Sequence, residues 1–402
     1  MTTRTTESYA RALRDAQEFS LVHGGPLFQL LLRAHLSSDA MTLVVRRVIV
    51  FVLIGWAPLL LLSTLGGHLL DGNVAVPFLL DGETHIRFLV VVPLLLAAEL
   101  VVHQRLMPVV RAFLDRDLIS EADDERFDAA INSAFRLRNS LLAEILMFAV
   151  VYGIGVGVVW RNYTALDVPT WYAQPFEGGH RLPSAGLWYA YVSLPLFQFL
   201  LLRWYYRLFI WIRFLWQVSR LELRLVPTHP DQLGGVGFLA NTVFAFSVLL
   251  IAHGAMLGAQ IANRIFFAGA ALQDFKEEIF VMLVFLLCVV FGPMLAFSPQ
   301  LSRAKRRGLL EYGALAESYV RQFDGKWLRG GAQSEPLMGS ADIQSLADMG
   351  NSFAVVRTMR LAPISRDAVL ELAACVLVPL IPLLLTVMPV EALIKKLIGV
   401  VL

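Results

Sequence analysis

Arginine and aromatic residues alternate between Leu202 and Arg224. On a helix that turns about 100° per residue, the arginines fall within about 140° of one another and leave an aromatic back. Guanidinium groups bind phosphate through paired hydrogen bonds, so the stripe predicts a face that binds anions or lipid headgroups. The alternative is a helix that leaves a bilayer and is anchored by snorkelling arginines. The arginines are Arg203, Arg207, Arg213, Arg220 and Arg224.

The next loop, residues 228–237, contains His229 and Asp231 in the sequence THPDQLGGVG. A histidine and an aspartate together could bind a cation or transfer a proton. A zinc site needs at least three protein ligands, however, and no other histidine is close in the sequence. We therefore predict no metal site and no cofactor. The alternative is a structural turn, favoured by Pro-Asp and Gly-Gly, in which Asp231 accepts backbone N–H bonds ahead of the next helix.

Glu99 and Gln260 are polar residues within otherwise apolar segments. Such residues are costly in hydrocarbon and usually face the interior of a helix bundle or a wet cavity. Glu99 lies at a depth similar to that of Arg203 and Arg207, so we predict an ion pair with one of them. That pair could be structural, or it could belong to a functional site.

His253 lies near the middle of another apolar segment, next to the glycine pair Gly254 and Gly258. This small-xxx-small pattern allows a second helix to approach closely. His253 is either the donor or acceptor of an interhelical hydrogen bond or a pore residue that titrates near neutrality. Both interpretations place it inside a helix bundle.

The last apolar segment contains Pro379, Pro382 and Pro389, with Thr386 as its hydroxyl. Prolines in a spanning helix free backbone carbonyls, which then need a neighbouring helix or water as partner. The segment is therefore expected to be a broken helix, and one use of such a helix is to line a wet path.

Sequence signatures of catalysis are missing from the chain: there is no HExxH, CxxC, GxSxG or Walker sequence. This absence lowers the expectation of an enzyme. Cys288 and Cys375 both lie in apolar runs, so we interpret them as unpaired core residues.

The composition places these residues in a membrane protein. Of the 402 residues, 57% are hydrophobic and 16% are charged, whereas soluble globular domains carry about 25% charged residues. We predict an all-α, polytopic membrane protein with about seven transmembrane helices. The apolar segments are 48–66, 87–104, 141–160, 185–203, 238–261, 278–298 and 369–389.

The distribution of basic residues predicts the topology. With the N-terminus inside, the cytoplasmic segments hold 27 of the 34 Lys and Arg residues and the opposite side holds 7. Because basic residues are concentrated on the cytoplasmic side, we expect the N-terminus in and the C-terminus out, in a bacterial-type inner membrane. On the outer side, Trp171, Tyr172 and Trp188 resemble an interfacial aromatic belt.

The cytoplasmic segments have helical periodicity. Residues 105–140 predict an amphipathic insertion, a pair of helices on the inner face of the membrane. After the sixth span, Ser302–Phe323 continues as one long helix bent near Pro293 or Pro299. A loop from 324 to 340 then precedes a helix over Ala341–Met359, which Ser340 could cap. The expected regions are an N-terminal amphipathic segment 1–43, spans one to six in 44–300, a cytoplasmic helical region 301–365, and the last span with its tail, 366–402.

This order of elements resembles the seven-transmembrane ion channel superfamily, typified by insect odorant and gustatory receptors. The counterparts are Arg203–Arg224 and Ser302–Phe323 as cytoplasmic helix extensions, Ala341–Met359 as the short cytoplasmic helix, and Arg366–Pro389 as the pore-lining last span. The resemblance rests on architecture. The last span lacks the family's short aromatic signature, and about a dozen residues follow it.

From topology and resemblance we expect a homo-oligomeric ion channel or channel-like protein with a cytoplasmic helical anchor. The alternatives are a membrane-embedded enzyme or lipid-handling protein with a site at headgroup level, and a membrane scaffold. The expected partners are the lipid bilayer, including anionic phospholipid, and further copies of the chain, with no nucleic acid. The pore candidates are Glu99, His253, Gln260, Thr386, Pro379 and Pro382, and the loop or lipid-binding candidates are His229, Asp231, Arg203, Arg207, Arg213 and Arg220.

Overall fold

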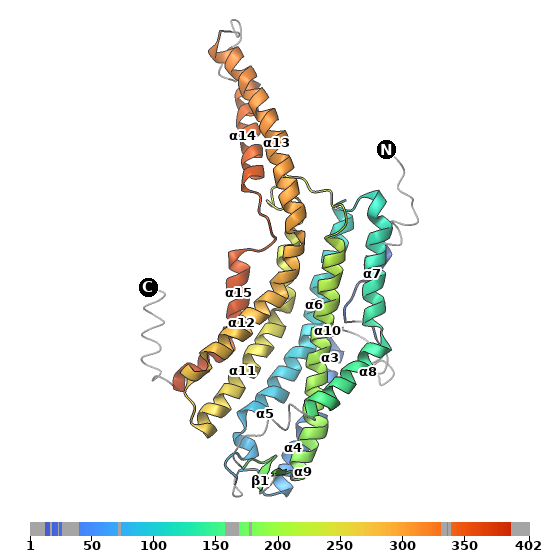
Figure 1. Cartoon of the computed structure of the whole chain (residues 1–402), viewed down its shortest axis with the longest axis vertical. Helices are drawn as coiled ribbons and strands as arrows, with labels where there is room; N and C mark the ends of the chain where they lie inside the picture. Colours follow the sequence, from blue (N-terminus) through green and yellow to red (C-terminus); the bar gives the residue numbers. More distant parts are fainter. Residues whose placement is uncertain are drawn as a thin grey trace.

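The computed structural model describes residues 13–16, 18–22, 24–25, 40–70, 74–156, 169–176, 179–330, 336 and 339–386. Most of the predicted N-terminal segment 1–43 and the tail 387–402, with Pro389, lie outside the described residues. The fold is an elongated bundle of helices (Figure 1). The α-helices are α3 (Ala40–Gly55), α4 (Ala57–Leu65), α5 (Gly82–Ile86), α6 (Val92–Asp115), α7 (Asp124–Arg138), α8 (Leu141–Val150), α9 (Ser184–Trp188), α10 (Leu194–Val218), α11 (Ser247–Ala268), α12 (Lys276–Phe291), α13 (Ser298–Phe323), α14 (Ala341–Thr358) and α15 (Arg366–Leu377).

Shorter elements join or extend these helices. Strands β1 (Gln174–Phe176) and β2 (Gly179–Arg181) pair antiparallel, with Gln174 opposite Arg181. The 3₁₀ segments are Phe78–Leu80, Glu121–Asp123, Gly237–Phe246, Leu272–Phe275, Gly292–Phe297 and Val378–Thr386, and the π-helical turns are Arg87–Val91, Tyr189–Ser193 and Asp324–Leu328.

Six helical stretches are long and apolar enough to cross a membrane. A seventh is possible because α7 and α8, with its extension to Val156, form a pair bent by 47° at a short break. The predicted all-helical fold is therefore confirmed, and its six to seven long apolar helices compare with the prediction of about seven. The orientation of the termini stays a prediction. The stretches are Val44–Leu65, Gly82–Asp115, Ser184–Val218, Gly237–Ala268, Leu272–Leu328 and Arg366–Thr386.

The sixth span and the helix after it, which is predicted to be cytoplasmic, form one helical stretch of 57 residues. Helix α12 passes into the 3₁₀ segment Gly292–Phe297, which has Pro293 in its first turn, and continues as α13. Proline cannot donate a backbone hydrogen bond, so the change of helix type occurs where the ladder is interrupted. The predicted long, proline-marked helix is present.

The insertion 105–140 differs from its prediction as a pair of separate helices. Its first part is the end of α6, which continues the second span to Asp115 with Pro108 in its interior. Its second part, α7, stands alongside α10 (Figure 1). The predicted helical periodicity is confirmed. The apolar residues of α7 pack on α10, where Phe127 and Ile131 are buried.

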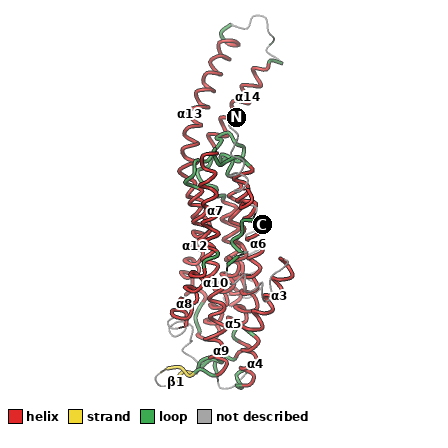
Figure 2. Tube along the Cα trace, turned by 90° about the vertical axis from the view of Figure 1, so that its right-hand side faces the viewer, coloured by secondary structure: helices red, strands yellow, loops and turns green. Residues whose placement is uncertain are grey.

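Helices α13 and α14 form a hairpin that extends beyond the rest of the bundle (Figures 1 and 2). Ser340 caps α14 as predicted, since its hydroxyl accepts from the Asp342 N–H at 3.1 Å. The predicted loop begins late, because α13 continues as a π-helical turn over Asp324–Leu328. Hydrogen bonds from Lys326 and Trp327 to Asp342 join the two helices and hold the pKa of that carboxyl below its usual range.

At the opposite end of the bundle, the predicted aromatic belt is wrong for Trp171. This side chain is fully buried, and its indole N–H donates to Asp81 at 2.8 Å. Tyr172 and Tyr189 pack against it. The predicted belt residue Trp188 is half-buried and donates to the Ile54 carbonyl at 3.0 Å. These rings close the end of the bundle that lies opposite the α13–α14 hairpin.

Candidate functional site

The buried charges centre on Glu99 of α6. Its carboxylate lies 2.7 Å from Arg207 of α10 and 2.8 Å from Arg47 of α3, and all three residues are buried. The predicted pairing with Arg207 is present. Arg47 was missed because it comes from the first span, 52 residues away, and nothing in the local sequence points to it. Charge-assisted bonds from two helices to one carboxylate fasten α3, α6 and α10 together.

Arg203, one turn before Arg207 on α10, is also buried. It faces toward Gly25 and Glu144 of α8: a Cβ placed on Gly25 would lie 3.3 Å from a Glu144 oxygen and 4.0 Å from an Arg203 nitrogen. Arg203 and Arg207 therefore lie inside the bundle. Their predicted role as snorkelling or headgroup-binding residues is not what the structure shows.

The predicted stripe of five arginines on one helix is wrong, because α10 ends at Val218. Arg213 is exposed and reaches Ser133 of α7 at 3.4 Å. Beyond the helix end, Arg220 stacks on the Trp216 ring at 5.2 Å and Arg224 pairs with Asp117 at 2.8 Å. Alternation with aromatic residues predicted helix for the whole stretch, but the chain turns at Ser219.

The loop 228–237 is the predicted structural turn. One carboxylate oxygen of Asp231 accepts the N–H groups of Leu233 and Gly235 at 2.7 and 3.2 Å, and the other accepts that of Gly237 at 2.8 Å. Burial raises the pKa of Asp231, but these three backbone bonds and nearby His229 bring it below the usual range. A carboxylate occupied by its own loop is a poor metal ligand or base.

The same turn is hydrogen-bonded to Arg360, which lies in the segment that leads to the last span. The Arg360 N–H donates to the Gln232 carbonyl at 2.8 Å, and the Arg360 guanidinium reaches the Asp231 carbonyl at 3.4 Å. The backbone of this turn has positive φ angles of 57° at Gln232, 65° at Gly234 and 101° at Gly235. Glycine adopts such angles without the strain that other residues incur.

His253 makes the interhelical hydrogen bond that was one of its two predicted roles. Its Nε2 lies 2.8 Å from the Tyr205 hydroxyl of α10, and its Nδ1 lies 2.7 Å from the Leu249 carbonyl. A carbonyl can only accept, so Nδ1 carries the hydrogen and Nε2 accepts from Tyr205. Both nitrogens of a neutral imidazole are satisfied.

The last span packs against α11 at the predicted glycine pair, Gly254 and Gly258. The Val376 carbonyl lies against Gly254, and a Cβ on Gly258 would lie 3.3 Å from the Pro379 carbonyl. In the 3₁₀ segment Val378–Thr386, the donor to the Pro379 carbonyl would be residue 382, a proline without an N–H. This carbonyl faces Gly258 of α11, where a glycine Cα–H group can make a recurrent weak contact between helices.

The remaining intramembrane candidates do not join one site. Gln260 is half-buried on α11, and the Thr386 hydroxyl donates to the Leu383 carbonyl of its own segment at 2.6 Å. Pro382 is exposed at the end of the last span. Glu99 and His253 have separate partners, as described above.

A second buried network, which was not predicted, lies at the end of the bundle opposite the α13–α14 hairpin. Asp81 accepts four hydrogen bonds, two from Thr84 and one each from Trp171 and Asn263. Arg87, four residues after Glu83, bonds to the Glu83 carboxylate and to the Tyr189 hydroxyl. The local sequence around Asp81 does not indicate this network, because Trp171 and Asn263 lie 90 and 182 residues away.

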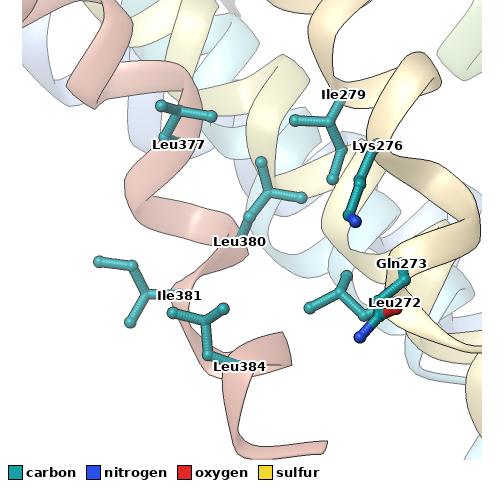
Figure 3. A pocket seen from close by; sticks show the side chains of 8 residues that line it. All are labelled: Leu272, Gln273, Lys276, Ile279, Leu377, Leu380, Ile381 and Leu384. Atoms are coloured by element: carbon teal, nitrogen blue, oxygen red, sulfur yellow. The ribbon is translucent and has the colours of Figure 1, made fainter. Parts of the chain in front are cut away.

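A polar cleft and an apolar groove are among the hollows on the bundle. The first is a polar cleft of about 820 Å³ between loop 219–227 and residues 296–312 at the start of α13; Arg220, Arg303 and Arg307 line it. The second is an apolar groove of about 460 Å³ between α12 and the last span. Figure 3 shows Leu380 and Ile279 pointing into this groove from its two sides, with Lys276 beside Ile279.

Within the described part of the chain, no group of three or more His, Cys, Asp or Glu side chains is placed to hold a metal ion. Cys288 and Cys375 are free thiols. Cys375 is half-buried, whereas Cys288 is exposed on α12, so its predicted core position is wrong. Its apolar neighbours reflect a surface suited to lipid.

The chain matches no protein-family model, no curated protein sequence and no solved structure in these three comparisons.

Proposed function

We propose that the protein is a homo-oligomeric ion channel or channel-like membrane protein whose copies meet around the last span. The observation that carries the proposal is the one-sided packing of this span. Its inner face, with Leu372 and Val376, is buried on α11 and the core, while its other face is apolar and exposed. The exposed residues are Leu377, Val378, Ile381, Leu384 and Leu385.

The α13–α14 hairpin supplies a second surface for assembly. It stands clear of the bundle (Figure 2) and exposes Leu310, Leu315 and Leu328. Large apolar side chains far from the apolar spans are unfavourable in water unless a partner covers them. Contacts between hairpins of neighbouring copies would act as the predicted cytoplasmic anchor.

Two of the predicted pore residues already have partners within one subunit. Glu99 is held by arginines, and His253 is held by Tyr205 and Leu249. This arrangement favours a conduction path between subunits over one through a single bundle. The exposed apolar face of the last span would then form a hydrophobic constriction, which gates by wetting and dewetting.

The test uses single cysteines on a background with Cys288 and Cys375 replaced by serine. In this background, Ile381→Cys is expected to form cross-links between subunits and to react with a membrane-impermeant thiosulfonate, with a change in conductance in planar bilayers. Leu142→Cys, on the exposed face of α8, is the matched control and should do neither. Particles that are monomeric by mass in lipid nanodiscs, with no conductance, would contradict the proposal.

A further inference from the structure

The polar cleft lies where the apolar runs of two helices end. Helix α10 ends at Val218, two residues after the first cleft residue Trp216, and α13 gains its first charge at Arg303. Trp216 lines the cleft and is about half exposed, and Leu295 is exposed nearby. An apolar surface that meets arginines at one level is the pattern of a membrane–water interface, here on the predicted cytoplasmic side.

Three guanidinium groups line this cleft, and none of them is in ion-pair contact with a carboxylate of the described residues. Arg303 and Arg307 lie one turn apart on α13, and Arg220 faces them from the loop after α10. Arg220 lies over the Trp216 ring, and Arg303 donates to the Pro299 carbonyl. Two exposed arginines elsewhere do pair with acids, Arg224 with Asp117 and Arg321 with Glu317.

The cleft also contains Glu222 and Glu311, so its charge is not uniformly positive. Three arginines against two glutamates leave one excess positive charge. Its floor is held in place by Gln300, which donates to the carbonyls of Ser219 and Leu221 at 2.5 and 2.7 Å. A fixed floor keeps the arginine-bearing walls apart and prevents collapse of the hollow.

We propose that this cleft binds the phosphate group of an anionic phospholipid from the adjacent leaflet. Arg303, Arg307 and Arg220 bind the phosphate oxygens, and the acyl chains extend along the apolar surface by Trp216 and Leu295. Arginine suits this role because its planar fork donates two hydrogen bonds to one phosphate. The site is independent of conduction, since its geometry lies within one subunit.

The experiment measures lipid binding to the purified full-length protein in a neutral maltoside detergent. Native mass spectrometry follows the titration with dioctanoyl phosphatidylglycerol, and dioctanoyl phosphatidylcholine is the zwitterionic comparison. Basic residues near an anionic lipid each contribute about a fivefold change in affinity. Arg303→Gln/Arg307→Gln is therefore expected to weaken phosphatidylglycerol binding by about 25-fold.

Arg306→Gln is the matched control. It removes one positive charge from the same helix, where the double variant removes two, but Arg306 does not line the cleft and bonds to Ser302. Its affinity should stay within about twofold of the wild type, because distant exposed charges are screened by salt. Glu311→Gln should tighten binding, an effect that a merely structural role of the cleft would not produce. Thermal melting checks that each variant is folded, and Arg303→Lys/Arg307→Lys, which keeps the charge, should bind with intermediate affinity.

Equal affinities of the Arg303→Gln/Arg307→Gln and Arg306→Gln variants would overturn the proposal. Inorganic phosphate that displaces the lipid at equal concentration would also overturn it, because the occupant would then be a free anion. Failure of conductance or of assembly leaves this binding measurement unaffected, so the two proposals are tested separately.

Discussion

At the scale of single residues, Glu99 is the counter-ion on which two buried arginines depend. Removing one partner of a buried ion pair leaves an uncompensated charge and costs about 3–5 kcal/mol. Glu99→Gln is therefore expected to lower the free energy of unfolding by about this amount, because Arg47 and Arg207 stay buried without it. Unfolding by sodium dodecyl sulfate in mixed micelles measures the change.

Arg321→Gln is the control for this prediction. Arg321 and Glu317 form an exposed pair on α13, and pairs of this kind contribute about 0–1 kcal/mol. Equal destabilisation by Glu99→Gln and Arg321→Gln would show that the charges around Glu99 are compensated in another way.

The hydrogen bonds of Asp231 predict that the stability of its turn depends on pH. Its folded pKa lies below the ordinary value of about 3.9. The turn is therefore stabilised at any pH above that ordinary value, and the stabilisation is lost as the pH falls through the lower, folded pKa. Hydrogen exchange at the amides of Leu233 and Gly237, corrected for the intrinsic pH dependence, should accelerate in that range.

Asp231→Asn removes the titrating group and serves as the comparison. Its side-chain oxygen can still accept a hydrogen bond but carries no charge at any pH. In this variant the corrected exchange should be faster at neutral pH and should no longer change between pH 6 and the acid range. A wild-type profile that matches the variant would exclude Asp231 as the cause.

At the scale of elements, the contact between α11 and the last span depends on two glycines and two carbonyls. Gly254→Ala places a methyl group into the Val376 carbonyl, so one of the two helices must move. We expect a lower thermal unfolding temperature for Gly254→Ala, although alanine alone favours helix by about 1 kcal/mol. Gly258→Ala, with 3.3 Å to the Pro379 carbonyl, should have a smaller effect.

Gly153→Ala is the matched control for this contact. Gly153 lies in the extension of α8, and a Cβ there would meet nothing within 4 Å. The variant should be as stable as the wild type or more stable. If Gly254→Ala melts at the same temperature as Gly153→Ala, the last span is not held by this close approach.

Residue patterns predicted the positions of the helices better than the contacts between them. Charge-free runs located the spans because hydrocarbon excludes charge over a fixed thickness, and Ser340 located the start of α14 because its cap is local. The partners of Glu99 and Asp81 could be predicted only in part. Arg207 shares a depth with Glu99, whereas Arg47 and Trp171 reach their carboxylates through tertiary packing that leaves no local pattern.

The sequence patterns likewise could not predict which parts of a span are α-helix and which are 3₁₀ helix. The fifth span begins as ten residues of 3₁₀ helix, Gly237–Phe246, and nothing in its apolar periodicity separates 3₁₀ from α. The prediction of an arginine stripe is wrong for a related reason. It assumes one continuous helix through Ser219, whereas α10 ends at Val218.

At the scale of the whole molecule, the distribution of basic residues still predicts the topology. A green fluorescent protein fused to the N-terminus should fluoresce, and one fused to the C-terminus should stay dark. Alkaline phosphatase at the C-terminus should be active, because that enzyme folds outside the cytoplasm. A C-terminal fluorescent fusion that lights up would contradict an odd number of crossings.

The α13–α14 hairpin has one more consequence. From Arg303 to Phe323, α13 rises about 30 Å along its axis, which is roughly four Debye lengths at physiological ionic strength. Over that separation, mobile ions cancel the field of a charged surface. The tip of the hairpin is therefore electrically isolated from the lipid headgroups, and whatever meets Leu328 and Asp324 there encounters the local charges of the tip and not those of the bilayer.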